Sequence, residues 1–555
     1  MSTNLSQLAR RHGLNHLLFH ALGEIKKEKG TISREDIQSL ADKYLVGTAS
    51  IYGTASAYDF LKPDSASLKA FVCTGSSCMT SGTVEQIQDK LHHKLGEEAV
   101  GQMVCLGRCH ENKAFHYKGK NYSGSDIDHL TAILDGEYPE RNDDIPVYTR
   151  GTTILTGEAL DAKTCLLQLT QALQSTPNEL LKQIKASKLR GRGGAGFPMH
   201  IKLESVKNID TPEKYIVCNA DEGDPGAFSD RYLLEQQPFL LLLGMAITGY
   251  ITGAKEGAIY LRAEYPYAME VIGAAIKTFH TFGEIPTADG TGFSFKLYLV
   301  PAQGAYICGE ETALLNSIEG QRPEVRTRPP FPTVSGLFGQ PTVVNNVETL
   351  ACVPYIIQNG GAAFASVGTT HSTGTKLISL DGFFQKPGLY EVPMGFSFGT
   401  LLYEMAGGFH TPVKAVQVGG PLCGVIPTSR INDLTIDFES FKDNGFLLGH
   451  AGVMCIPQSF PMIEYMQHLF AFTSHESCGK CFPCRIGAQR GAELVEKAMK
   501  DPSFRIEETL LLDLIETLEL GSLCGLGGGV PLPLKNILTY FKEEIHPYFL
   551  EEVIN

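Results

Sequence analysis

Apolar residues recur at helical spacing near both ends of the chain. Close to the N-terminus, Ile37, Leu40 and Leu45 follow a capping-box pattern at residues 33–36, which marks the start of a helix. Close to the C-terminus, "GAELVEKAMK" and "IEETLLLDLIETLEL" show the same periodicity. We therefore expect a helical segment at the start of the chain and a helical bundle at its end.

Two regions between these ends carry short β-like runs. Residues 70–73 and 102–105 flank the helical pattern "TVEQIQDKLHHKL", which predicts a small α/β module. Further along, "KLISLDG", "GLYEVP" and "AVQVGG" are separated by turn residues and predict a β-rich domain. The polar stretch "DGEYPERNDDIPVYTR" predicts a linker, and residues 151–365 mix strands, helices and glycine loops.

The longest apolar run covers residues 239–254. It is shorter than the roughly 20 residues that cross a bilayer, and Gly and Thr interrupt it. We read it as a buried helix that opens at Pro238. Because the N-terminal residues also lack the pattern of a secretory signal, we expect a cytoplasmic protein without a membrane span.

Length and charge narrow the class of protein. A chain of 555 residues exceeds what one hydrophobic core supports, so several domains are expected. The net charge of -14 argues against nucleic acid or anionic lipid as a partner, because both favour basic surfaces. In a cytoplasmic chain the 14 cysteines indicate metal ligands, redox groups or packing residues rather than disulfides.

One group of cysteines combines a tight triplet with a remote fourth member. Cys478, Cys481 and Cys484 have C-x-x-C-x-x-C spacing, and Cys524 is the only later cysteine. A 4Fe-4S cluster needs four thiolates, and this spacing lets one loop present three of them. A structural zinc site is the alternative, although zinc ligands more often come as two C-x-x-C pairs.

A second group pairs Cys73 with Cys78 and Cys105 with Cys109. Two such pairs on neighbouring loops could hold a 2Fe-2S cluster, with two thiolates on each iron. Zinc is a stronger alternative here than in the first group. The remaining six cysteines lie mostly in apolar runs and are expected to be buried packing residues: Cys165, Cys218, Cys308, Cys352, Cys423 and Cys455.

A glycine-rich loop, "LRGRGGAGFP", contains Gly191, Gly193 and Gly196 at dinucleotide-fingerprint spacing. The residues before it look helical and polar rather than like a buried strand, so an ordinary Rossmann turn is not supported. The loop either allows close approach to a flat or phosphorylated ligand or is a structural turn. Two polar stretches favour a ligand: "NADEGD" after a short strand, and "VVNNVETL" at a predicted helix start.

Six ordered motifs together resemble a known family: "RGRGGAGFP", "CNADEGDPG", "GAYICGEETALL", "RPPFP", "NNVETL" and "ESCGKCFPCR" with "SLCGLG". They resemble the NADH-binding flavoprotein subunit of respiratory complex I and its relatives in NAD-reducing hydrogenases and NAD-dependent formate dehydrogenases. The resemblance runs from about residue 150 to the C-terminus. Residues 1–135 resemble the thioredoxin-like 2Fe-2S subunit of complex I, fused in front.

The resemblance implies a multidomain α/β protein that binds FMN, NAD, a 2Fe-2S cluster and a 4Fe-4S cluster. The expected order is an N-terminal helical segment (1–60), a thioredoxin-like 2Fe-2S domain (61–135), a linker (136–170), a Rossmann-like FMN and NADH domain (171–370), a β-grasp domain (371–455) and a 4Fe-4S helical bundle (456–555).

The resemblance also assigns site residues by position. It implies that the FMN and NADH contacts come from Gly191, Gly193, Gly194, Phe197, Lys202, Asn219, Asp221, Glu222, Asp224, Tyr260, Glu264, Phe331, Asn345, Asn346 and Thr349. Phe197 and Phe331 are expected against the adenine. The cluster ligands are expected to be the eight cysteines of the two groups above. No acid–base catalytic residue is expected, because hydride transfer to a flavin depends on alignment.

Departures from the family pattern help to choose a relative. Asp224 and Ser205 replace the usual Glu and a third aromatic residue, and Ala263 replaces Gly. "NADEGD", "AEYPYA" and the intact cysteines of the front module look more like formate dehydrogenase, whereas Pro225 keeps the hydrogenase form. We expect the diaphorase subunit of a soluble NAD-dependent formate dehydrogenase with a molybdenum or tungsten partner. An NAD-reducing nickel–iron hydrogenase is the alternative, and a non-catalytic, zinc-binding assembly protein is the rival from another class.

Overall fold

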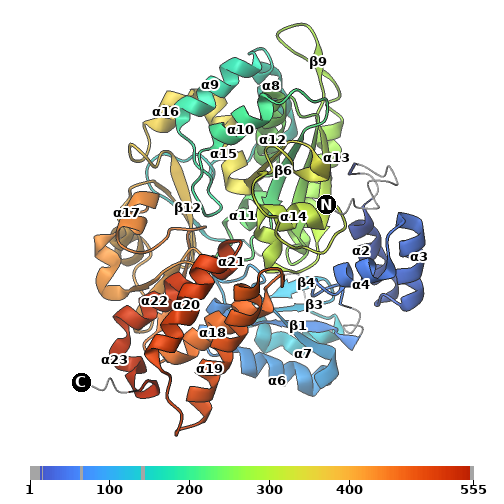
Figure 1. Cartoon of the computed structure of the whole chain (residues 1–555). Helices are drawn as coiled ribbons and strands as arrows, with labels where there is room; N and C mark the ends of the chain where they lie inside the picture. The colour runs from blue at the N-terminus through green and yellow to red at the C-terminus, as the bar shows by residue number, and fades with distance from the viewer. Residues whose placement is uncertain (1–12, 15–16, 63–66, 139–143, 551–555) are drawn as a thin grey trace.

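The computed structural model describes residues 13–14, 17–62, 67–138 and 144–550. The expected helical segment, the module after it, the linker and the final helical region each include some residues outside these ranges. The segment at the start contains three helices, α2 (Leu18–Lys29), α3 (Arg34–Tyr44) and α4 (Thr48–Ala55) (Figure 1). Ser33 and Asp36 form the predicted capping box at the start of α3.

The next module is a four-stranded sheet with the strand order β2-β1-β3-β4. Its strands are β1 (Ala70–Cys73), β2 (Val100–Met103), β3 (Phe115–Tyr117) and β4 (Lys120–Tyr122), and α6 (Val84–Leu95) connects the parallel pair β1 and β2. This is the predicted small α/β module. The first strand ends at Cys73, so the four cysteines of this module lie in or beside the loops at one end of its sheet.

The central domain is built on a parallel sheet with the order β10-β7-β6-β11. The strands are β6 (Tyr215–Ala220), β7 (Glu256–Arg262), β10 (Lys296–Ala302) and β11 (Thr342–Asn346). The chain adds β7 and β10 on one side of β6 and then returns to add β11 on the other side. In parallel sheets, ligands bind at such a reversal, beyond the carboxyl ends of the strands. Here that point lies between β6 and β11.

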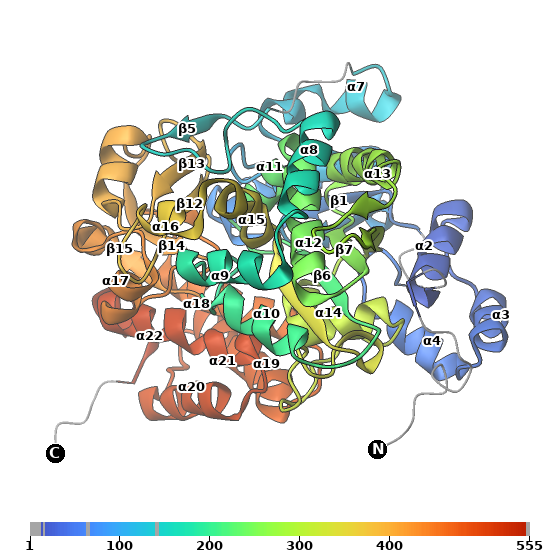
Figure 2. The same cartoon turned by 90° about the horizontal axis from the view of Figure 1, so that it is seen from above.

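The two faces of this sheet bury different segments. Residues 216, 218 and 220 of β6 face one core with α12 (Pro238–Thr252) and α15 (Val347–Asn359). Residues 215 and 217 face the opposite core, which includes α14 (Glu311–Ile318) and apolar residues of α2 to α4. The N-terminal helices therefore cover one face of the central sheet (Figure 2). As predicted, α12 begins at Pro238 and is almost wholly buried.

The third sheet is mixed and has the order β15-β14-β16-β12-β13-β5. Five of its strands form the predicted β-rich region: β12 (Thr375–Leu380), β13 (Gly388–Pro393), β14 (Val413–Val418), β15 (Val425–Pro427) and β16 (Gly452–Pro457). The sixth, β5 (Val147–Thr149), comes from the expected linker and pairs in parallel with β13. The same segment continues into α8 (Ala162–Ala172), which packs against α12, so much of it is structured.

The C-terminal region is helical, as predicted, and contains α18 (Met462–His475), α19 (Ala488–Lys500), α20 (Glu508–Gly521), α21 (Gly525–Gly529) and α22 (Pro531–Tyr540). These helices lie together, at the lower left of Figure 1. The cysteine triplet lies between α18 and α19, and Cys524 immediately precedes α21. Within the described residues, no helix combines the length and apolar character needed to cross a membrane.

Candidate functional site

A cavity of about 650 Å³ opens at the reversal point of the central sheet, beside the ends of β6 and β11. The register pairs Asn219 with Asn346, which brings the two polar motifs that follow these strands side by side. Ten of the fifteen residues predicted to contact FMN and NADH line this cavity: Gly191, Gly193, Gly194, Phe197, Lys202, Asn219, Asn345, Asn346, Phe331 and Thr349. Residues from segments up to about 150 positions apart thus surround one space.

The glycine loop forms one wall of the cavity and follows helix α9 (Pro177–Ser187), which agrees with the helical pattern seen before it. The backbone N–H of Arg192 donates to the Thr349 hydroxyl over 2.8 Å, which ties the loop to the first turn of α15. A Cβ atom on Gly193 would lie 2.8 Å from the Asn346 Cβ, so only glycine fits there. The loop is therefore packed against α15 with its backbone facing the cavity.

Polar side chains with unused hydrogen-bonding capacity lie at the same place. The Nδ2 atom of Asn345 is buried and has no partner among the described residues, and the same holds for Oδ2 of Asp221. Burial raises the pKa of Asp221 well above its usual value. Buried polar groups are normally paired, so an unpaired amide at a cavity wall indicates a polar ligand. The Asn345 amide, the glycine loop and the start of α15 together fit a flavin nucleotide.

Charged residues that the sequence reasoning did not assign complete the cavity. Lys202 donates to Glu311 over 3.1 Å and to the backbone carbonyl of Val344 over 2.9 Å. Arg328 pairs with the same Glu311 over 3.1 Å, and Glu310 also lines the wall. Glu310 and Glu311 lie in the motif "GAYICGEETALL", so their position in a family motif was the available signal.

Two aromatic side chains stand at the edge of the cavity. Phe197 is 47% exposed and Phe331 is 54% exposed, which is unusual for phenylalanine. Both line the cavity, as does Ser205, where the family pattern has a third ring in some members. An exposed ring offers a flat apolar face for stacking, so this arrangement supports the predicted adenine contact.

The other five predicted residues do not line the cavity: Asp221, Glu222, Asp224, Tyr260 and Glu264. The carboxylate of Glu222 accepts hydrogen bonds from the backbone of residues 230 and 231 and from the Tyr265 hydroxyl. Asp224 accepts from the Tyr306 hydroxyl over 2.6 Å. The Tyr260 hydroxyl is within 2.7 Å of the Ser317 hydroxyl. These side chains hold the domain together behind the cavity.

A buried charged cluster connects the central domain to the mixed sheet. His450 lies 3.1 Å from a carboxylate oxygen of Asp230 and 3.6 Å from one of Glu222. Burial disfavours the charged imidazole, but these carboxylates outweigh that effect and raise the pKa of His450 to about 9. The Asn346 amide donates to the same Asp230 oxygen over 2.5 Å. The cluster therefore supports Asn346 from behind.

The four cysteines of the front module converge. The sulfur atoms of Cys105 and Cys109 are 3.7 Å apart, and all four thiols are buried. The hydrogen bond with Cys105, burial, and the charges of Cys78 and Cys73 raise the pKa of Cys109 well above its usual value. These effects require that the four sulfurs be close neighbours. A closed set of four thiol ligands fits the predicted 2Fe-2S cluster.

The C-terminal cysteines also gather at one place. Burial and the charges of Cys481 and Cys478 contribute to a pKa of about 11 for Cys484. The pKa of Cys524 rises to about 12, chiefly through burial, with contributions from Glu310, Cys478 and Cys484. The remote cysteine thus lies near the triplet, and its neighbour Glu310 also lines the large cavity. This set fits the predicted 4Fe-4S cluster and adjoins the nucleotide site.

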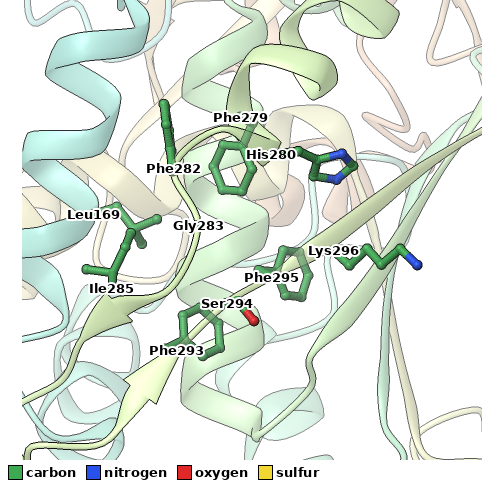
Figure 3. Close-up of a pocket in the computed structure, with 10 residues that line it drawn as sticks. All are labelled: Leu169, Phe279, His280, Phe282, Gly283, Ile285, Phe293, Ser294, Phe295 and Lys296. Atoms are coloured by element: carbon green, nitrogen blue, oxygen red, sulfur yellow. The ribbon is translucent and has the colours of Figure 1, made fainter.

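The six remaining cysteines are all buried, as predicted for packing residues. A second cavity, of about 310 Å³, lies between the end of α13 (Pro266–His280) and the β8–β9 hairpin (Ile285–Pro286 and Gly292–Phe293). Figure 3 shows that phenylalanine rings and aliphatic side chains make up most of its wall. It contains no cysteine, carboxylate or amide side chain, so it does not share the chemistry of the larger cavity.

Three family models match the chain. Residues 184–355 match the Nuo51 FMN-binding domain, and residues 464–548 match the NADH-ubiquinone oxidoreductase-F iron–sulfur binding region. Residues 6–137 match the thioredoxin-like [2Fe-2S] ferredoxin. The first match contains the glycine loop and both polar motifs of the cavity. The other two contain the two groups of four cysteines.

Two curated relatives illustrate the range of similar proteins. The second of two F-type NADH-quinone oxidoreductase subunits in Rhizobium meliloti is 43% identical over 376 residues, which cover 66% of this chain and 88% of the relative. The HndC subunit of the NADP-reducing hydrogenase of Solidesulfovibrio fructosivorans is 42% identical over 379 residues, or 68% of this chain and 77% of the relative.

A solved structure matches almost the whole chain. A chain of the NAD⁺-reducing [NiFe]-hydrogenase in the H₂-reduced state superposes with a TM-score of 0.85 at 28% sequence identity. The match covers 97% of this chain and 94% of that chain. The order of all the domains is therefore shared, including the fused front module.

Proposed function

This chain belongs to the family of F-type NADH-quinone oxidoreductase subunits and related hydrogenase subunits, and from that premise we propose that it is the diaphorase subunit of an NAD-reducing hydrogenase complex. The single observation that carries the choice of complex is the match over 97% of the chain to the NAD⁺-reducing hydrogenase structure. The two curated relatives described above match only about two thirds of the chain.

The coarser identity is firm. The chain is an NAD(H)-dependent oxidoreductase subunit with an FMN-binding domain, a 2Fe-2S domain and a 4Fe-4S region, as the family resemblance predicted. The zinc alternatives for the two cysteine groups, and with them the non-catalytic assembly protein, are set aside by these domain matches. The chemistry that FMN supplies when bound is acceptance of a hydride from NADH and release of its electrons one at a time.

We assign roles to this chain's residues within the cavity. The glycine loop and the start of α15 hold the flavin nucleotide, and the unpaired Asn345 amide binds a polar atom of it. Lys202, fixed by Glu311 and the Val344 carbonyl, presents a positive charge to the nucleotides. Phe197 and Phe331 stack on the adenine at the cavity edge. These assignments orient the two nucleotides, which is the protein's contribution to hydride transfer.

The eight cysteines are the proposed cluster ligands: Cys73, Cys78, Cys105 and Cys109 for 2Fe-2S, and Cys478, Cys481, Cys484 and Cys524 for 4Fe-4S. Glu310 lines the nucleotide cavity and also affects the pKa of Cys524, so the 4Fe-4S site adjoins the cavity. The front module adjoins the central domain from another side, because Gly226 donates its backbone N–H to the Cys109 sulfur. Electrons can therefore leave the flavin toward either cluster.

A formate dehydrogenase complex is the second candidate. The segments "NADEGD" and "AEYPYA" favour it, as does the complete set of four cysteines in the front module. In that complex a molybdenum or tungsten subunit would take the place of the nickel–iron subunit. The diaphorase chemistry proposed for this chain is the same in both complexes.

Purification of the intact complex under anaerobic conditions tests the proposal. We expect one FMN per chain, acid-labile sulfide, a nickel-containing partner, and reduction of NAD⁺ by H₂. Molybdenum or tungsten with formate-dependent reduction of NAD⁺ would establish the second candidate instead. A colourless chain that lacks FMN and sulfide would contradict the diaphorase function itself.

A further inference from the structure

The front module touches the central domain through the loop that carries two of its four cysteines. Arg262, the last residue of β7, donates from Nη2 to the Cys105 carbonyl over 2.7 Å. Arg231 donates from Nη1 to the Gly107 carbonyl over 3.0 Å. The Gly226 backbone N–H donates to the Cys109 sulfur over 3.2 Å. The central domain therefore holds this cysteine loop directly.

The contact also shapes the loop. Cys105 has a φ of 50°, in the left-handed region that residues with a side chain rarely adopt. A Cβ atom on Gly107 would lie 2.4 Å from the Tyr265 ring, so the loop packs tightly against this ring. The hydrogen bond from Arg262 to the Cys105 carbonyl thus stabilises an unfavourable backbone conformation at a cysteine that is a proposed cluster ligand.

Arg262 carries its charge in a buried place. Its side chain is 2% exposed, and it pairs with Glu264, which is 5% exposed, over 2.9 Å. The second oxygen of Glu264 and the Nε atom of Arg262 have no hydrogen-bond partner among the described residues. Buried charges are screened less by salt and solvent than surface charges, so both act strongly on their surroundings.

The two charges lie at different positions relative to the cysteines. The guanidinium group contacts the backbone of Cys105 directly, whereas the described contacts of the Glu264 carboxylate lead to Arg262. The charge on the Cys105 thiol acts on Arg262 and raises the pKa of this arginine, together with the nearer Glu264. Reduction adds a negative charge to an iron–sulfur cluster, and the potential of a cluster depends on the net charge around it.

We propose that Arg262 is a positioning residue that raises the reduction potential of the 2Fe-2S cluster held by the front module, and that Glu264 opposes this effect. The inference rests on the proposed function, because it requires the four cysteines of the module to hold that cluster. It gives Arg262 a role at the cluster, and it places Glu264 in that role rather than at the flavin.

Redox titration of the intact complex, followed by electron paramagnetic resonance, tests the inference. We expect Arg262→Gln to lower the potential of the 2Fe-2S signal and Glu264→Gln to raise it. Each shift should correspond to at least a tenfold change in the reduction equilibrium, which is about 59 mV for a one-electron couple. The 4Fe-4S signal in the same samples is the internal control and should keep its potential. Arg262→Lys should stay close to the native value.

Opposite shifts separate an electrostatic role from a merely structural one, since structural damage would lower cluster content without shifting the two potentials in opposite directions. If Arg262→Gln does not accumulate with its cluster, Glu264→Gln decides alone. A 2Fe-2S potential that is unchanged in the folded variants, or that moves in the same direction in both, overturns the inference. Absence of any 2Fe-2S signal in the native complex would overturn the cluster assignment as well, so the two failures are distinguishable.

Discussion

The backbone N–H of Gly226 donates to the sulfur atom of Cys109 over 3.2 Å, although 117 residues separate them in the chain. Gly226 lies seven residues after Asn219, which lines the nucleotide cavity. One short segment of the central domain thus runs from the proposed flavin site to a proposed cluster ligand. This continuity explains why the front module packs where it does.

The cluster ligands can be tested separately. Cys109→Ser should remove the 2Fe-2S signal and leave FMN and the 4Fe-4S signal in place, and Cys481→Ser should do the reverse, because each cluster needs its own four thiolates. Iron, sulfide and electron paramagnetic resonance measurements check both variants. Cys165→Ala, a buried cysteine outside both groups, is the control and should keep both signals. Loss of both signals from a folded single-cluster variant would contradict the assignment.

Lys202 should matter for nucleotide binding. Lys202→Met removes the charge that Glu311 and the Val344 carbonyl hold at the cavity wall. We expect FMN occupancy or the affinity for NADH to fall at least tenfold, since charged hydrogen bonds contribute roughly 1.5–3 kcal/mol. Flavin content and NADH titration measure this. The control is Lys185→Met, which breaks an exposed ion pair with Glu204 outside the cavity and should change neither value. Normal values in Lys202→Met would remove Lys202 from the site.

Gly193 should not tolerate a side chain. In Gly193→Ala the new Cβ atom would lie 2.8 Å from the Asn346 Cβ, so the loop or α15 must shift. Overpacking of this kind costs about 1–3 kcal/mol, which we expect as weaker FMN binding. Fluorescence titration of the flavin-free protein with FMN measures the change. Gly157→Ala has open space around its Cβ and is the control. Equal FMN affinity in both variants would show that the loop does not contact the flavin.

His450 should make stability depend on pH. Burial of the ring and the charge of Lys376 lower its pKa, but Asp230 and Glu222 outweigh them, so the pKa rises from 6.5 to about 9 in the folded chain. A raised folded pKa stabilises fully below pH 6.5, and this contribution is lost as pH rises to about 9. Thermal denaturation should therefore show a lower Tm at about pH 9 than at about pH 6.5.

The matched variants for that pH effect are both histidine replacements. His450→Gln should flatten the change in Tm between about pH 6.5 and 9, because the titrating charge is gone. His468 is buried and has a pKa of about 4, so it is neutral throughout this range and His468→Gln should keep the native pH dependence. If His450→Gln retains the full native slope, the charge on His450 does not contribute to stability.

Much of the local structure was predictable because it depends on residues close together in the chain. The capping box at Ser33, the start of α12 at Pro238 and the helix before the glycine loop all follow from neighbouring side chains. The cysteine spacing indicated two ligand groups for the same reason. The six ordered motifs then identified the family, whose domains the comparisons confirm.

The tertiary structure alone decided which polar residues share a surface. Asn219 and Asn345 meet because β6 and β11 are neighbours in the sheet, an order that no local pattern encodes. Glu264 pairs with Arg262 behind the cavity, and residues 147–149 complete the mixed sheet. Spacing along a chain fixes which side chains can act together within one turn or loop. Strand order and domain packing bring together residues far apart in sequence, and these depend on the burial of whole faces rather than on any single motif.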